Sequence, residues 1–249
     1  VSIFGRHNKK RRRDMMRAKI WLVLAGLLLA TSSTYAEVIE NYTWKAVPGK
    51  DAEMLAAFTE AKAIHEDMGA SVSMSQHGTG STQLIDYTMR WDNLDAWAKS
   101  MDMGRSPEGA ARWQKFMAQY DEPVGEMVAS SGGANLDSSK SADDFDGNYV
   151  FAVFIWEPNA GQRAEFLAGV MAAEKLHESL GARVEVYGEQ FGDFGRVHYV
   201  MMYDDYASWA ESNKKMAQSK EWAEMQAASA AGGTGTLVST MRGQTLVAQ

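Results

Sequence analysis

Hydrophobic side chains follow two different periods along the first half of the chain. Alternation of apolar and polar residues predicts four strands, at 39–47, 72–76, 82–91 and 124–130. Between the first two strands, apolar residues recur at helical spacing over 51–68. A second helix is predicted after Asp92 or Asn93, with an interruption at 104–107. The order of elements is therefore β-α-β-β-α-β.

The second half of the chain repeats this order. Its predicted elements are a strand, a helix, two strands, a helix and a strand, at 149–156, 162–180, 183–189, 196–203, 207–230 and 236–242. The sequence of residues 64–72 matches that of residues 176–184, and Trp97 matches Trp209 at the same separation along the chain. These matched positions indicate a tandem duplication of a unit of roughly 95 residues.

The patterns divide the chain into four parts. Residues 1–36 are predicted to be a signal peptide, 37–131 the first ferredoxin-like repeat, 132–147 a linker and 148–249 the second ferredoxin-like repeat. The linker is inferred from a composition rich in Ser, Gly, Asp and Asn. Because each sheet has helices on one face, its other face needs cover. We expect an α+β fold in which two tandem βαββαβ repeats pack sheet to sheet as a pseudo-dimeric α/β barrel within one chain.

Two further features complete the pattern of each repeat, namely a tyrosine-rich third strand and a capped helix that carries Trp97 or Trp209. With the duplication and the order of elements, they make residues 39–247 resemble the dimeric α/β-barrel (ferredoxin-like) superfamily. That superfamily includes antibiotic-biosynthesis monooxygenase-like, EthD-like and NIPSNAP-like proteins. The resemblance implies the fold and leaves the activity open, since this fold hosts several chemistries.

Residues 1–36 have the features of an export signal. Basic residues crowd the segment up to Lys19, an apolar run follows at 20–30, and small or polar residues lead to Ala36. The apolar run is shorter than the ~20 residues of a membrane-spanning helix. We therefore expect a periplasmic or secreted protein with no stable membrane anchor. An uncleaved anchor helix is the alternative.

Charge and cysteine content exclude several classes of function. The full chain has a net charge of −7, and loss of residues 1–36 leaves 17 Lys and Arg against 31 Asp and Glu, a net charge of −14. Such a surface repels nucleic acid, so no nucleic-acid partner is expected. The chain has no cysteine, which excludes disulfides, thiolate metal sites and a cysteine nucleophile.

The first candidate site is an aromatic set around one histidine in each repeat. Its members are His65, Trp44, Tyr87 and Trp97 in the first repeat and His177, Trp156, Tyr199 and Trp209 in the second. We expect them between helix and sheet, where an aromatic pocket with an imidazole suits a flat apolar ligand. Each histidine could be a base, a haem ligand, or a hydrogen-bonded core residue near a helix end, and for the aromatic residues the alternative is ordinary core packing, in which such stripes occur more often than in pockets.

A second candidate site lies on the opposite strand faces. Its members are His77, Asp86, Arg90 and His198. If His198 faces Asp86 across the pseudo-twofold axis, the two would form an acid–base or metal pair. Simple ion pairs on solvated strands are the alternative.

These observations favour an exported protein that binds a small aromatic or apolar ligand in a pocket between helices and sheet. One alternative is a cofactor-independent monooxygenase or isomerase that uses a pocket histidine, and a second is haem or metal binding. We predict no cofactor and no metal site from the sequence. It leaves open whether the protein is an enzyme and whether it forms a homo-oligomer.

Overall fold

The computed structural model describes residues 36–80 and 83–246. The predicted signal segment, apart from Ala36, lies outside the described residues. The first repeat contains β1 (Val38–Ala46), α2 (Asp51–Asp67), β2 (Ser71–Thr79), β3 (Leu84–Trp91), α3 (Leu94–Arg105), α4 (Pro107–Met117) and β4 (Gly125–Asn135). After a short 3₁₀ helix, η1 (Ala142–Phe145), the second contains β5 (Val150–Pro158), α5 (Arg163–Ser179), β6 (Arg183–Phe191), β7 (Val197–Tyr203), α6 (Tyr206–Gln218), α7 (Lys220–Ala231) and β8 (Gly235–Thr245).

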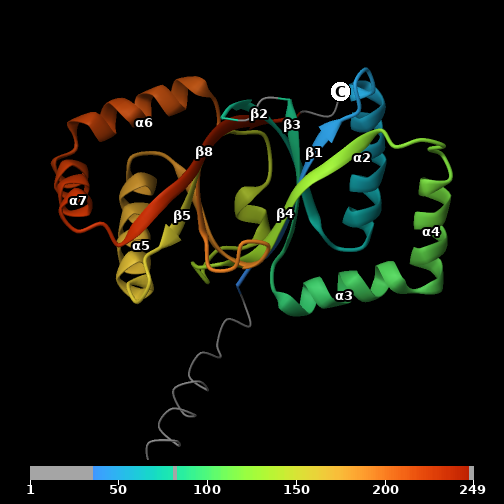
Figure 1. Ribbon diagram of the computed structural model, residues 1–249, viewed down its shortest axis with the longest axis horizontal. Coiled ribbons are helices and arrows are strands. Elements are labelled where there is room, and N and C mark those ends of the chain that lie inside the picture. The colour runs from blue at the N-terminus through green and yellow to red at the C-terminus, as the bar shows by residue number, and fades with distance from the viewer. Residues whose placement is uncertain (1–35, 81–82, 247–249) are drawn as a thin grey trace, which may run out of the picture. The chain divides into compact units, whose positions relative to one another are not determined.

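The eight strands form one closed antiparallel barrel in the order β1-β3-β2-β8-β5-β7-β6-β4. Each repeat supplies four consecutive strands of this circle, and the two sheets join at the β2–β8 and β4–β6 edges. The helices of the two repeats lie on opposite sides of the barrel (Figure 1). The predicted α+β fold of two ferredoxin-like repeats in an intrachain α/β barrel is confirmed.

A hydrophobic layer separates the helices of each repeat from its sheet. In the first repeat, Tyr87 and Met89 of β3 are buried with Met54 and Phe58 of α2. The second repeat has an equivalent cluster that includes Tyr199 of β7. Because successive residues of a strand point to opposite faces, Asp86, Thr88 and Arg90 must face the interior of the barrel.

The barrel interior has its own hydrophobic cluster. Phe151 and Val153 of β5 are buried there with Val200 and Met202 of β7 and Ile39 of β1. Four of these five residues come from the second repeat. Separation of the repeats would expose them at a cost of about 25 cal/mol per Å² of apolar surface.

The two seams between the repeats are built alike. At one seam the amide of Leu136 donates to the carbonyl of Val186 (2.7 Å), and at the other the amide of Leu246 donates to that of Met74 (2.8 Å). Leu136, which follows β4, packs against the core of the second repeat. Leu246, which follows β8, packs against the core of the first. Each repeat therefore completes the hydrophobic core of the other.

A glycine permits close backbone approach at each seam. A Cβ atom on Gly133 would lie 2.0 Å from the carbonyl oxygen of Gly188, and one on Gly243 would lie 2.3 Å from that of Gln76. Real Cβ atoms do not approach oxygen so closely, so only glycine fits these two positions without backbone movement.

Two details differ from the sequence-based predictions. The segment 132–147 was expected to be a flexible linker, but Gly132–Asn135 continue β4, and Phe145 of η1 is buried. The small residues Gly132, Gly133 and Ala134 of this segment pair with β6 at one seam between the repeats. The helix expected over 207–230 is two helices, because the Ser219 side chain accepts from the amide of Trp222 and starts α7.

Candidate functional site

The paired histidines make the same contacts in both repeats. Nδ1 of His65 lies 2.7 Å from the hydroxyl of Tyr87, and Nδ1 of His177 lies 2.6 Å from that of Tyr199. In each pair the histidine comes from the long helix and the tyrosine from the strand beneath it. These contacts place each histidine between its helix and the sheet.

A tryptophan closes each cluster, and sequence analysis missed both of them. The ring centroids of His65 and Trp113 are 4.7 Å apart, and those of His177 and Trp222 are also 4.7 Å apart. The two tryptophans are not related by the offset that aligns the histidines, so the sequence match does not pair them. A search for any tryptophan in the last helix of each repeat would have found them. We call the two sets the His–Tyr–Trp clusters.

Two of the four predicted tryptophans belong to the same helix–sheet layers. Trp44 packs edge-on against Phe58, with ring centroids 5.6 Å apart. Trp156 packs against Phe166 at 6.1 Å. Their place in these layers agrees with the sequence-based expectation.

The other two predicted tryptophans make contacts that differ between repeats. The indole of Trp97 donates to the carboxylate of Glu40 (2.8 Å). Trp209 stacks on Tyr203 with ring centroids 5.5 Å apart. Both tryptophans also pack against the hydrophobic core of their own repeat, so the sequence match at this position corresponds to a shared place in the fold with different polar and aromatic partners.

Burial keeps both histidines neutral. It lowers the pKa of His65 and that of His177 from 6.5 to about 4. Nε2 of His177 is buried without a hydrogen-bond partner among the described residues. The neutral imidazole of His177 therefore has an unused hydrogen-bonding group at Nε2.

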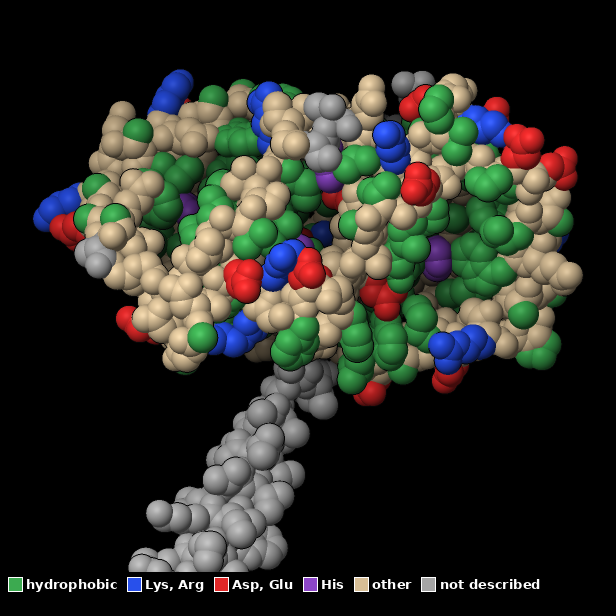
Figure 2. All heavy atoms as spheres, viewed as in Figure 1, with side chains coloured by type: hydrophobic (Ala, Val, Ile, Leu, Met, Phe, Trp, Pro, Cys, Tyr) green, Lys and Arg blue, Asp and Glu red, His purple; other side chains and the backbone are tan. Residues whose placement is uncertain are grey.

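The first cluster lies at an open apolar surface. His65, Trp113 and Phe116 are only partly buried. Figure 2 shows hydrophobic side chains gathered around histidine atoms on this side of the barrel, over α2 and α4. An exposed apolar patch of this kind marks a surface for ligands or partners.

The barrel interior contains a histidine–carboxylate pair from each repeat. Nε2 of His77 lies 2.8 Å from Asp86, and Nε2 of His198 lies 2.9 Å from Glu189. Positions 77 and 189 are equivalent, as are 86 and 198, so the second repeat keeps the pair with its two members exchanged. The expected pairing of His198 with Asp86 is wrong, because each residue has a partner on the neighbouring strand of its own repeat.

Arg90, predicted in the same site, links the two repeats instead. Its guanidinium donates to both carboxylate oxygens of Glu185 at 3.0 Å and lies 3.3 Å from Glu37. Although burial opposes the charge, Glu185 raises the pKa of Arg90. Burial, and then the charge of Glu185, raise the pKa of Glu37 to about 9. This carboxyl group is therefore protonated at neutral pH.

Two cavities adjoin these interior groups. One, of about 220 Å³, lies within the barrel and is lined by Asp86, Arg90, Tyr187 and His198 among others. Figure 2 shows a hollow between the two repeats in which histidine, acidic and basic atoms are visible. Neither this cavity nor the second one is lined by His65 or His177.

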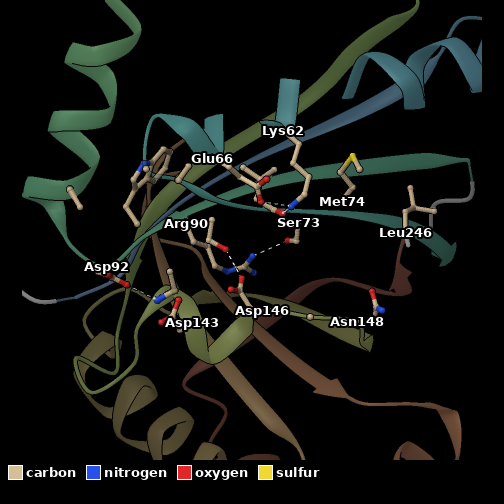
Figure 3. A pocket seen from close by; sticks show the side chains of 18 residues that line it. Lys62, Glu66, Ser73, Met74, Arg90, Asp92, Asp143, Asp146, Asn148 and Leu246 are labelled. Carbon is tan, nitrogen blue, oxygen red and sulfur yellow. Dashed lines mark hydrogen bonds and ion pairs between the residues drawn. The ribbon is translucent and has the colours of Figure 1, made fainter. Parts of the chain in front are cut away.

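The second cavity is a groove of about 780 Å³ beside the end of α2 (Figure 3). Its cationic groups already have partners. Lys62 contacts Glu66 and the carbonyl of Val72, and Arg90 donates to Ser73 (3.0 Å). The other charged residues that line the groove are acidic, namely Glu66, Asp92, Asp143 and Asp146, so we assign no ligand to this groove.

Within 36–80 and 83–246, no cluster of three or more His, Asp or Glu side chains could hold a metal ion. Among these same residues, no helix is long and apolar enough to cross a membrane.

Comparison with known proteins places these features in a wider group. Residues 151–248 match the sequence profile of the NIPSNAP family. A comparison with curated proteins gave no match.

Solved structures share the architecture of the whole barrel. A monooxygenase-like protein from Fusobacterium nucleatum is 10% identical, with a TM-score of 0.54 over 86% of this chain and 94% of its own. One from Lactobacillus acidophilus is 9% identical, with a TM-score of 0.55 over 85% and 93%. A chlorite dismutase-like protein is 13% identical, with a TM-score of 0.51 over 85% and 95%. Identities this low show the fold alone. The shared architecture shows the fold of the barrel, and the second repeat is similar to the NIPSNAP family.

Proposed function

We propose that this protein binds a small aromatic or apolar molecule between helices and sheet, at the His–Tyr–Trp cluster of each repeat. The observation that supports this most is the equal geometry of the two clusters. The histidine–tryptophan distance is the same in both, although Trp113 is the seventh residue of α4 and Trp222 the third of α7. The same histidine–tryptophan contact is thus formed from different helical positions in the two repeats, and this recurrence is what supports a shared binding role.

The protonation of the histidines favours binding over catalysis. A general base works best when its pKa lies near the working pH. An imidazole with a pKa of about 4 accepts a proton poorly at neutral pH, whereas it remains a good hydrogen-bond partner for a ligand. This argues against a cofactor-independent monooxygenase or isomerase that uses these histidines as its base.

Haem fits the described residues poorly. Nε2 of His177 would have to hold the iron, but its ring packs against Trp222 with ring centroids 4.7 Å apart, which leaves no room for a group as large as a porphyrin. A haem needs a flat, apolar space beside that nitrogen.

We also propose that the protein is exported to the periplasm or secreted, with the mature chain starting at Glu37. The basic start, the short apolar run and the small residues before Ala36 support this. N-terminal sequencing of protein from the native host tests it. Residues 1–36 found on a cytoplasmic form would contradict it.

The binding proposal is tested with native mass spectrometry and a fluorescent titration. Protein from the native host is examined for a retained small molecule. Recombinant protein is then titrated with 1-naphthol, which should quench Trp113 and Trp222 because both adjoin the clusters. The double variant His65→Gln/His177→Gln should lose most of this binding and keep its melting temperature within a few degrees.

Tyr206→Phe is the control, because Tyr206 is exposed and contacts Trp209 rather than a histidine. It should bind 1-naphthol like the unaltered protein. If the double histidine variant binds the probe unchanged, the clusters are structural and the proposal is wrong.

A further inference from the structure

The cavity inside the barrel has a defined mouth. Ser130 and Ser131 of β4 line it on one side, and Asp193 and Arg196 of the β6–β7 hairpin line it on the other. At this point β4 pairs with β1 alone, since its pairing with β6 begins at Gly132. The hollow seen between the repeats in Figure 2 lies in this region. A small molecule therefore has a route to the interior.

The two walls of the cavity differ in polarity. The second repeat contributes an apolar wall, formed by Phe151, Val153, Ile155, Val200 and Met241. Facing it are polar side chains, Asn41, Thr43, Ser75, Asp86, Thr88, Tyr187 and His198. The cavity thus suits a molecule with an apolar body and one polar edge.

A hydrogen-bonded chain fixes the orientation of Tyr187 at the polar wall. Glu189 accepts from Nε2 of His198 at 2.9 Å, so in the neutral imidazole Nδ1 carries the lone pair. The Tyr187 hydroxyl lies 2.8 Å from that nitrogen, and the two rings stack with centroids 4.3 Å apart. Burial raises the pKa of Tyr187, so it remains a phenol. Its oxygen has two lone pairs, of which a hydrogen bond from Ser131 takes one, so the other is available to a donor on the ligand.

A second set of hydrogen bonds, in the first repeat, fixes the orientation of Thr43 at the polar wall. Asp86 accepts from Nε2 of His77 at 2.8 Å and from the hydroxyl of Thr43 at 2.6 Å. The Thr43 oxygen, which lines the cavity, is thereby left with its lone pairs outward. Because Asp86 and Glu189 already have partners at both carboxylate oxygens, the wall offers acceptors without an unpaired charge.

We propose that the barrel interior is a second binding site, which takes a one-ring molecule bearing a hydroxyl group, with the ring on the apolar wall and the hydroxyl donating to Tyr187. The volume agrees, since an apolar cavity of about 150 Å³ holds benzene and this one is about 220 Å³. The site lies on the opposite faces of the sheets from the His–Tyr–Trp clusters. It stands independently of the function proposed for them.

The test uses 4-fluorophenol and fluorobenzene, which differ in the hydroxyl alone, with the full chain and ¹⁹F NMR line width as the readout. The phenol should bind more tightly. Tyr187→Phe should weaken phenol binding several-fold, to at most about tenfold, and leave fluorobenzene unchanged. Val153→Phe should abolish binding of both probes, because the larger ring fills the cavity.

Three results would overturn the proposal. These are no binding of the phenol to the unaltered protein, unchanged phenol binding in Tyr187→Phe, and unchanged binding in a folded Val153→Phe. If Val153→Phe does not fold, Ile155→Phe, nearer the mouth, replaces it. His65→Gln is the matched control for location. It should leave phenol binding unchanged, whereas a loss in this variant would place the probe at the His–Tyr–Trp cluster.

Discussion

The two repeats differ in the residues that face the barrel interior. The first repeat has Arg90 where the second has Met202, and it has His77 and Asp86 where the second has Glu189 and His198. The polar pair is kept with its members exchanged, while the arginine has no counterpart. The pair, rather than either residue, is therefore what both repeats require. The arginine serves a purpose that only one side of the barrel needs.

The largest expected effect comes from making the first repeat resemble the second at this point. Arg90→Met removes the partner of the buried Glu185. Loss of one partner from a buried ion pair costs about 3–5 kcal/mol of the free energy of unfolding. Urea denaturation measures this. Arg90→Met/Glu185→Gln should recover a large part of the loss, and no recovery would mean that the ion pair is not its cause.

A glycine at a seam, Gly133, can be compared with a glycine in a helix, Gly169. Gly133→Ala forces a Cβ atom to within 2.0 Å of a carbonyl oxygen, so strands β4 and β6 must move apart. We expect a loss of about 2–3 kcal/mol. Gly169→Ala, in α5 with open space around it, should instead gain about 0.5–1 kcal/mol. Equal effects of the two substitutions in thermal denaturation would contradict the close approach at the seam.

The order of histidine and carboxylate in the His77–Asp86 pair can be reversed by mutation. His77→Asp alone places two carboxyl groups together in the interior and should cost about 2 kcal/mol. Adding Asp86→His restores a histidine–carboxylate pair in the order of the second repeat, and stability should return to within about 1 kcal/mol. Denaturation of the single and double variants gives the coupling energy. Additive effects would show that the two residues do not act as a pair.

The smallest effect concerns pH and the His–Tyr–Trp clusters. The pKa of His177 is lowered in the folded state to about 4, so the unfolded chain binds more protons below its own pKa of about 6.5. Stability is therefore full above pH ~6.5 and falls as pH decreases towards 4. We expect His177 to lower the free energy of unfolding by about 1–2 kcal/mol at pH 5 relative to pH 7. The variant His177→Gln should lack this contribution. An unchanged pH dependence in that variant would contradict its burial as a neutral ring.

The fold could be predicted because its signals are local or repeated. Alternation along β3 separates Tyr87 from Asp86, and the constant offset between matched segments reveals the duplication. The seams could not be predicted, since nothing local to Gly133 shows that it faces Gly188 in the other repeat. In the sequence alone, a glycine that permits two backbones to approach closely cannot be distinguished from a glycine in a linker.

The sites were predicted in part for similar reasons. His65 and His177 were found because repetition singled them out. Trp113 was missed because its counterpart comes from another turn of another helix. The pairing of His198 with Asp86 was wrong because neighbouring strands within a repeat bring Glu189 closer, and strand register cannot be read from composition.

The crossed positions of Leu136 and Leu246 have a consequence for how the chain is made. On the ribosome the first repeat is finished long before Leu246 exists, so it waits with an open core and an unpaired β2 edge. Bringing Leu246 to Met74 closes a very long loop, a slow step in the search for the native state. A nascent chain halted before β8 therefore carries a bare strand edge, and such chains are the ones we expect to aggregate.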